Sequence, residues 1–300
     1  IHGLTASDTN AVISITARKQ GIRSKIKNYV KSQFVNVVLS NLPESGSTEG
    51  DTLNDKLAFN NVAYGLRVQD EHISLNVPDV VQVIAVYESI DGEQPTLDTI
   101  TFSATASVGT NALLGENVVG SLSKAIARVV TNQGSNPSTG NANKLGIVYL
   151  NENRFVENEL VTFEESNIKT FIEGINISNT EGRYSNISQS YTLDQGQRDQ
   201  YYDYSRIIRK SNASIPTKRL LIIYDRYDVP SGDTGDIFSV NSYDSKNYTN
   251  NIPLIGKTQV RATDVLDFRP RPTPYTSTTA SPFDFPARTS AFTTQPQFLV

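Results

Sequence analysis

The sequence predicts a mainly β protein made of tandem β-sandwich or β-barrel-like modules, with one short N-terminal helix and an extended proline-rich C-terminal arm. Its composition leans to Thr, Ser, Asn, Val, Ile and Tyr, which favours strands joined by polar turns. Segments such as HISLNV and DVVQVIAVYES are rich in β-branched residues. The 300 residues include no cysteine, so the modules need cores that fold without disulfides, and the chain is long enough to bury them.

Residues 1–56 form the first predicted segment, which contains strands AVISITAR and FVNVVLS and a polar linker at 43–56. Apolar residues recur at helical spacing between Ile22 and Val37, which predicts a short amphipathic helix. Two interpretations of the basic cluster on this segment stay open, an anionic partner and a solvated face or subunit contact. The cluster consists of Arg18, Lys19, Arg23, Lys25, Lys27 and Lys31.

Residues 57–175 are predicted to hold β-modules with an internal repeat. AYGLRVQ, HISLNV and DVVQVIAVYES read as strands, and Asp91-Gly92 is typical of a hairpin turn. GENVVGSLSKAIARVV and NELVTFEESNIKTFIEGI then align, which suggests a duplicated β-module. Residues 125–129 fit both strand and helix periods, and their Val and Ile content favours a strand. The alignment pairs Glu116 with Glu159, Val118 with Val161 and Ser123 with Ser166.

Residues 176–270 are predicted to be a β-domain rich in aromatic and Asp/Arg residues, and 271–300 an extended Pro/Thr-rich arm. The tyrosine run could stack sugars or form a core or subunit interface. An extended arm with spaced phenylalanines is expected to lie on a neighbouring subunit or on the parent chain. The interface candidates are Tyr201, Tyr202, Tyr204, Arg269, Arg271, Phe283, Phe285 and Phe292.

No catalytic, cofactor or metal constellation stands out. The two histidines, His2 and His72, lack a G-x-S-x-G serine, and no glycine-rich phosphate loop occurs. The net charge of −4 and the absence of a long apolar run argue against nucleic acid and a membrane span. Of the late carboxylates, Asp225, Asp228, Asp233 and Asp236 have the wrong spacing for a calcium loop. Asp264 and Asp267 are expected to pair with the neighbouring arginines, which are Arg261, Arg269 and Arg271.

Four successive stretches carry a resemblance: YTLDQGQRDQYYDYSRIIRK, LLIIYDRYD, GDIFSVNSYD and VRATDVLDFRPRP. Together they resemble a domain of uncharacterised function in virion structural proteins of large contractile-tailed bacteriophages, notably those of marine cyanobacteria. LGENVVGSLSKAIARVV and NENRFVENELVTF resemble β-modules of the same tail proteins, with Asn158 where glycine is usual. The resemblance implies a baseplate, tail-fibre or related tail component and carries no catalytic residues.

The expected function is therefore structural, in virion assembly and subunit attachment, with the virion tail as location. Expected partners are other tail or baseplate proteins and further copies of the chain, as a trimer or hexamer. A host-glycan adhesin is the alternative, and a polysaccharide depolymerase is a third reading that needs two carboxylates across a cleft. Because the chain begins with Ile1 and contains no methionine, we expect a piece of a longer or processed chain.

Overall fold

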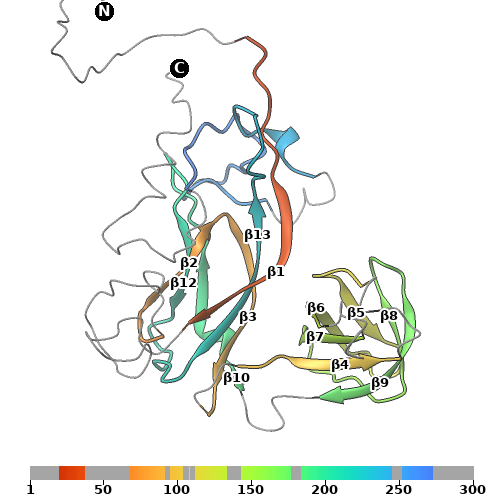
Figure 1. Cartoon of the computed structure of the whole chain (residues 1–300). Helices are drawn as coiled ribbons and strands as arrows, with labels where there is room; N and C mark the ends of the chain where they lie inside the picture. Colours follow the sequence, from red (N-terminus) through yellow and green to blue (C-terminus); the bar gives the residue numbers. More distant parts are fainter. Residues whose placement is uncertain are drawn as a thin grey trace, which may run out of the picture.

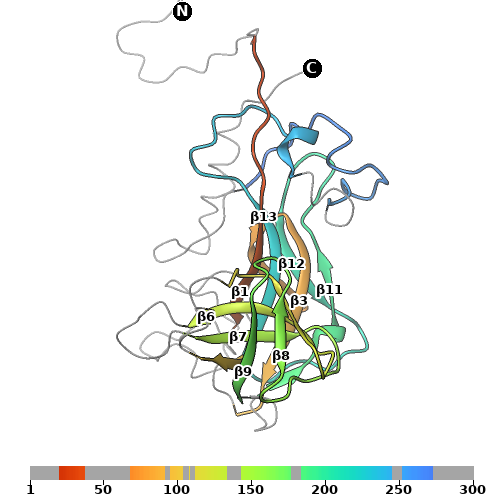
Figure 2. The same cartoon turned by 90° about the vertical axis from the view of Figure 1, so that its right-hand side faces the viewer.

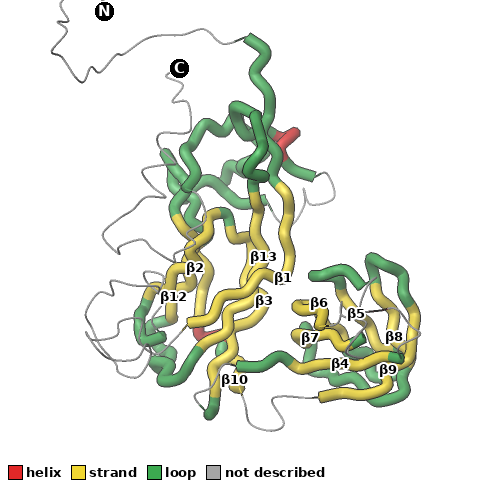
Figure 3. Tube along the Cα trace, viewed as in Figure 1, coloured by secondary structure: helices red, strands yellow, loops and turns green. Residues whose placement is uncertain are grey.

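A computed structural model describes residues 20–37, 68–91, 95–103, 108, 112–133, 143–176, 184–244 and 252–272. These residues form a two-sheet β-sandwich and a closed six-stranded barrel beside it (Figures 1 and 3). The mainly β prediction is confirmed. None of the described helical segments has the length and apolar character that a membrane-spanning helix needs.

The sandwich packs a four-stranded sheet against a three-stranded sheet, and every pairing is antiparallel. The first sheet has the order β1 (Asn28–Val37), β13 (Leu220–Asp228), β3 (Val80–Ser89), β10 (Tyr184–Asn186). The second has the order β11 (Tyr191–Asp194), β12 (Tyr204–Arg209), β2 (His72–Pro78). The helical segments η2 (Ser188–Ser190) and η3 (Val240–Ser242) are single 3₁₀ turns.

Strand β13 is buried on both faces, which explains its continuous apolar run LLIIY. Ile222 belongs to the core between the two sheets, together with Ile73 of β2 and Ile207 of β12. Its neighbours Leu221 and Ile223 point the other way, into a cluster shared with the barrel. Side chains alternate along a strand, so only a strand covered on both sides needs apolar residues at successive positions.

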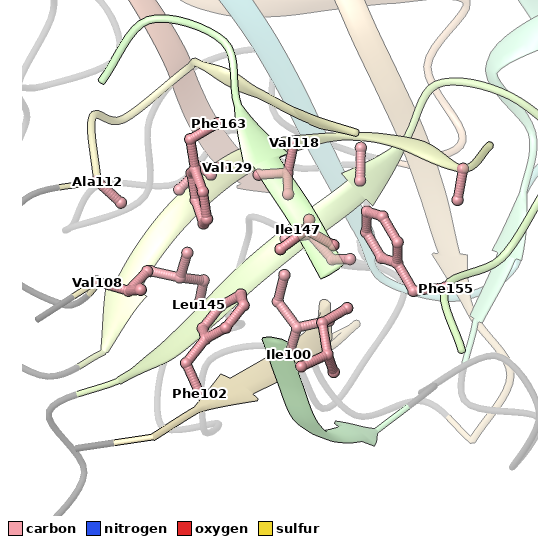
Figure 4. Close-up of a cluster of buried hydrophobic side chains, with 14 residues drawn as sticks. Ile100, Phe102, Val108, Ala112, Val118, Val129, Leu145, Ile147, Phe155 and Phe163 are labelled. Atoms are coloured by element: carbon pink, nitrogen blue, oxygen red, sulfur yellow. The ribbon is translucent and has the colours of Figure 1, made fainter. Parts of the chain in front are cut away.

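The barrel closes through β4 (Asp98–Phe102), β7 (Lys144–Tyr149), β6 (Ile126–Gln133), β5 (Asn117–Gly120), β8 (Leu160–Phe163) and β9 (Lys169–Asn176), in that order. Its interior is filled by aliphatic and phenylalanine side chains, including Ile100, Val118, Ile147 and Phe163 (Figure 4). Small barrels of this kind are packed cores, and closure leaves no open sheet edge. The strand prediction for residues 125–129 is confirmed, because most of that stretch lies in β6.

The aligned repeat has a structural counterpart, because β5 and β6 repeat as β8 and β9 at a shift of 43 residues, the spacing from Glu116 to Glu159. The N–H of Gly115 donates to the Val129 carbonyl at 2.8 Å, and that of Asn158 donates to the Ile172 carbonyl at 2.9 Å. Gly115 and Asn158 both have positive φ, +81° and +62°. Asparagine tolerates this left-handed conformation better than most residues, which explains why Asn158 can replace a glycine.

Two buried glutamates clasp the repeat units together, each reaching the unit that does not contain it. Glu116 accepts from the N–H and Oγ of Ser166 at 2.9 and 3.0 Å, and from the backbone N–H three residues before itself at 2.6 Å. Glu159 accepts from the N–H and Oγ of Ser123 at 3.1 and 2.8 Å, and from the backbone N–H of Val156, three residues before it, at 2.8 Å. The glutamates and serines that align between the two repeats therefore hydrogen-bond to each other, the glutamate of each repeat to the serine of the other.

The barrel is an insertion within the sandwich, since it lies in the connection between β3 and β10. A linear division into 57–175 and 176–270 therefore cuts through the fold: β2 and β3 precede the barrel but pair with β12 and β13. Long-range antiparallel pairing, which leaves no mark on local composition, produces this discontinuous domain. In Figure 2, β6 and β7 lie across the direction of β13.

The interface between barrel and sandwich combines apolar packing with a buried ion pair. Val130 and Val148 of the barrel join the cluster that contains Leu221 and Ile223. Arg128 Nη1 lies 2.7 Å from a carboxylate oxygen of the fully buried Asp225 on β13. The bulge in β1 adds a hydrogen bond from Ser32 Oγ to the Val129 carbonyl at 3.0 Å. The two modules are thereby joined into one unit.

The predicted N-terminal helix is wrong for the described residues, because 28–37 form strand β1 and pair with β13. The apolar spacing fitted a helix, but the β-branched residues pack in a sheet once β13 supplies backbone partners. The predicted strand AVISITAR, the 43–56 linker, Gly92 of the predicted turn and the arm beyond residue 272 lie outside the described residues.

Candidate functional site

The β11–β12 hairpin ends in a tight turn that separates two neighbouring tyrosines. The Arg198 N–H donates to the Tyr201 carbonyl at 3.0 Å, and Gln197 and Tyr202 form an antiparallel bridge across the turn. Tyr202 is 2% exposed, whereas Tyr201 is 37% exposed. Because successive side chains of an extended segment point in opposite directions, the turn sends one ring into the protein and the other outward.

Beneath the turn lies a buried cluster, the Lys27 cluster, formed by Lys27, Asp79, Tyr202, Tyr243, Asp267 and Arg269. The Lys27 side chain is completely buried, and its Nζ lies 2.6 Å from an Asp79 carboxylate oxygen. Nζ also donates to the hydroxyl oxygens of Tyr202 and Tyr243, both at 3.0 Å. The rings of Tyr202, Tyr243 and Phe238 surround it at 4.6 to 5.0 Å. Burial lowers the pKa of Lys27, and Asp79 opposes that shift.

Asp267 and Arg269 form the second half of the Lys27 cluster. Arg269 donates through Nε and Nη2 to the two Asp267 oxygens, at 2.9 and 2.8 Å, and its guanidinium lies 4.3 Å from the Tyr202 ring centre. The Tyr202 hydroxyl donates to Asp267. Burial alone would raise the pKa of Asp267, but the hydrogen bonds from Arg269 outweigh it and lower that pKa. Burial raises the pKa of Tyr202 well above its usual value.

The Lys27 cluster joins segments that are far apart in the sequence. Lys27 precedes β1, Asp79 lies between β2 and β3, Tyr202 precedes β12, and Arg269 belongs to the irregular segment after η3. Arg269 also donates to the Arg198 carbonyl at 2.8 Å, so the cluster holds the turn from below. Arg271 also approaches the cluster, with Nε 3.6 Å from an Asp79 carboxylate oxygen, so both acids of the cluster are paired inside the chain and shielded from solvent. We therefore interpret this cluster as structural.

Above the cluster, a groove of about 1020 Å³ opens between the turn and the segment 254–257. We call it the Tyr201 groove. Asp194 lines it but is held by Arg198, at 2.8 and 3.0 Å, and by Arg206 at 2.9 Å. Burial opposes ionisation of Asp194, yet hydrogen bonds from Arg198 and the Gly196 N–H lower its pKa to about 2. This carboxylate stays ionised and paired at neutral pH.

The rim of the groove is different, because its side chains are exposed and make no hydrogen bonds among the described residues. They offer a carboxylate, a carboxamide, a phenol ring and an ammonium group, from Asp199, Gln200, Tyr201 and Lys257. The aliphatic side chain of Leu254 completes the lining. The rim thus combines ring and aliphatic surface with donors and acceptors of both charge signs.

The remaining sequence candidates occupy structural positions. Asp267 pairs with Arg269, so the Arg–carboxylate prediction is confirmed there. Asp225 and Asp228 also pair with arginines, Arg128 and Arg226, which the sequence did not predict. Asp233 and Asp236 instead accept backbone N–H groups of Ile26 and Arg23, and Asp264 accepts from Thr263. His72 begins β2 and is exposed, and His2 lies outside the described residues. No group of three potential metal-ligating acids or histidines occurs among the residues that the structure describes.

The eight interface candidates fall into three groups. Tyr201 is exposed at the groove and Tyr204, at the start of β12, is half-buried. Tyr202, Arg269 and Arg271 are buried within the chain, which leaves them little surface for a neighbouring subunit. Phe283, Phe285 and Phe292 lie outside the described residues.

Sequence reasoning missed Lys27 and Asp79 as partners, because neither position carries a local signal. Lys27 belongs to a run of basic residues, and the other described members of that run are exposed or half-buried. Asp79 is one of many acidic residues in the chain. Fold and site together define a two-module β protein with a buried ionic cluster beneath a polar groove. No family model, curated protein or solved structure matches the chain.

Proposed function

We propose that the chain is a structural component of a bacteriophage tail, in the baseplate or a tail fibre, which acts in virion assembly and subunit attachment. One observation carries the proposal: barrel and sandwich are locked to each other across a buried interface, which we expect to make them one rigid unit. The lock consists of the shared apolar cluster, the Arg128–Asp225 ion pair and the Ser32 hydrogen bond. A part that transmits force between neighbours needs such rigidity, and the resemblance to tail proteins supports the same role.

Exposed apolar side chains on the barrel provide contact surface for neighbouring subunits. Leu122 and Phe171 are 73% and 60% exposed, although both belong to a well-packed module. Single exposed apolar residues are common on soluble proteins, so exposure alone does not show a contact. We propose these two as subunit contacts, to be tested by incorporation into assembled particles.

The direct test uses particles of the encoding phage, separated into tail and head fractions and analysed by mass spectrometry and immunogold labelling. We expect the chain in the tail fraction, in copy numbers that are multiples of three or six. A chain found only in the infected-cell lysate, and absent from purified virions, would refute the proposal.

A paired variant adds information on the contacts themselves. Phe171→Asp changes an exposed side chain of β9, so the fold should persist while incorporation into particles falls. Glu173→Gln, exposed on the same strand, serves as the matched control and should assemble normally. Equal incorporation of the two variants would exclude this face of the barrel from the assembly contacts.

Binding of a host glycan is the second candidate, and the Tyr201 groove is the observation that favours it. A depolymerase gains less support from the same groove. Glycoside hydrolysis needs a carboxyl acid that remains protonated near the working pH. Asp194, whose pKa is about 2, lacks that property.

A further inference from the structure

We propose that the Tyr201 groove binds a neutral saccharide, with the Tyr201 ring as a platform and Asp199, Gln200 and Lys257 as hydrogen-bonding groups. This inference deepens the second candidate function and rests on it. It is independent of the tail role, because a structural tail protein can lack a saccharide site and a saccharide-binding protein can lie outside a tail. The argument rests on the size of the groove, the chemistry of its rim and the rigidity of its floor.

The size of the groove suits a small organic ligand. Ligand sites in proteins enclose about 300–1,000 Å³, and the groove, at about 1020 Å³, lies at the top of that range. It is also open to solvent rather than enclosed. Such a space accommodates a chain of several sugar rings better than one small ion.

The rim matches a ligand that presents apolar C–H faces and many hydroxyl groups. The Tyr201 ring and the Leu254 side chain supply apolar surface. The Asp199 carboxylate accepts hydrogen bonds, Lys257 donates them, and the Gln200 carboxamide does both. A hydroxyl group can donate and accept, so neighbouring hydroxyls of one sugar can use all three.

The charge of the groove disfavours an anionic ligand. Arg198 lines the groove, but its guanidinium and that of neighbouring Arg206 are engaged by the carboxylates of Asp194 and Asp203. On the rim, the single ammonium of Lys257 is offset by the carboxylate of Asp199. Recognition of phosphate or sulfate relies on uncompensated, often bidentate, cations. Among the described residues, the groove offers only Lys257, whose charge is equal and opposite to that of Asp199, so a neutral saccharide is the matching class.

The floor of the groove is held in place before any ligand arrives. The turn is fixed by the Asp194–Arg198 pair and by Arg269 from the Lys27 cluster below. On the opposite wall, Gly256 has φ +53°, and a Cβ there would collide with the Asp199 carboxylate. The absence of a side chain therefore allows the two walls to approach each other. A preformed site loses less entropy on binding.

The test is isothermal titration of the intact chain with neutral pentasaccharides of glucose, mannose, galactose and N-acetylglucosamine, next to a sulfated and a sialylated oligosaccharide. We expect saturable binding of at least one neutral pentasaccharide and none of the charged pair. Tyr201→Ala should weaken that binding by roughly tenfold or more, which corresponds to about 1.4 kcal/mol. Gly256→Ala should weaken it as well, through displacement of Asp199.

Phe171→Ala is the matched control, because it removes an exposed ring from the barrel and should leave affinity unchanged. Near-UV circular dichroism checks that each variant is folded. Three results overturn the inference: no saturable binding of any neutral pentasaccharide, binding of the charged probes alone, or equal affinity of the Tyr201→Ala and Phe171→Ala variants. None of these results bears on incorporation of the chain into virions.

Discussion

Replacement of Glu159 by glutamine should open the barrel at a defined place. The Glu159 side chain is fully buried and accepts from the N–H groups of Val156, Leu122 and Ser123 and from the Ser123 hydroxyl. Its Oε1 accepts from the Val156 N–H at 2.8 Å, and its Oε2 accepts from the N–H groups of Leu122 and Ser123, both at 3.1 Å. Glutamine has the same shape but only one acceptor oxygen.

The size of the effect follows from these contacts. In one orientation of the amide, the Val156 N–H loses its acceptor, and in the other the N–H groups of Leu122 and Ser123 do. Each buried donor left without a partner costs about 1–3 kcal/mol. The variant also loses the charge that strengthens the remaining bonds. We therefore expect Glu159→Gln to lower the free energy of barrel opening by about 2–4 kcal/mol.

Acid should produce the same loss in the unmodified chain. Burial by itself raises the pKa of Glu159, but hydrogen bonds from Val156, Ser123 and Leu122 outweigh it and lower the pKa below 4.5. A carboxyl whose folded pKa lies below its unfolded value stabilises the fold above that unfolded value, and loses this contribution as pH falls through the folded pKa. Barrel stability should therefore fall below pH 4.5, with a weaker pH dependence in Glu159→Gln.

Native-state hydrogen exchange, followed by mass spectrometry on peptides from 112–133 and 143–176, measures this opening separately from the sandwich. The repeat provides an internal comparison, because Glu116→Gln removes the equivalent clasp and should give a similar loss. Glu173→Gln, exposed on β9, should change the opening free energy by less than about 0.5 kcal/mol. A loss below that value for Glu159→Gln, or exchange that rises in the sandwich peptides and not in the barrel, would show that the clasp argument is wrong.

Three further predictions follow the same logic. Lys27→Met leaves a buried carboxylate without its ammonium and should cost about 3–5 kcal/mol in urea unfolding, whereas the half-buried Lys25→Met should cost less than about 0.5 kcal/mol; equal losses would contradict the role given to the Lys27 cluster. Arg128→Leu removes a charged hydrogen bond to Asp225, so the opening free energy at the barrel–sandwich interface should fall by about 1.5–3 kcal/mol and hydrogen exchange there should become faster. Unchanged exchange at the interface would refute the proposed lock. Asn158→Ala forces a residue without a helpful polar group into the left-handed region and should lower the free energy of unfolding by about 1–2 kcal/mol, measured as a lower thermal midpoint. Asn158→Gly should leave the midpoint nearly unchanged, and the opposite order would exclude a backbone-strain explanation.

The local elements of this fold were within reach of the sequence. β-branched residues predicted β2, β3 and β6, and the alignment of Glu116 with Glu159 predicted a repeated module. Both kinds of signal act over a few residues or through similarity between two stretches. The same reasoning placed a helix over 22–37, because apolar spacing alone does not distinguish a helix from a strand whose partner lies almost 200 residues away, as β13 does for β1.

The tertiary structure decided what those elements do. It placed the barrel against the outer face of the four-stranded sheet, where Leu221 and Ile223 of β13 need a second layer of apolar partners. It also separated the tyrosine run, burying Tyr202 against Lys27 while Tyr201 faces the groove. From the sequence alone, the mainly β class, several of the strands and the Asp267–Arg269 pair could be determined. The Lys27 cluster and the groove could not, because each depends on side chains that only long-range pairing of strands brings within a few ångströms of one another.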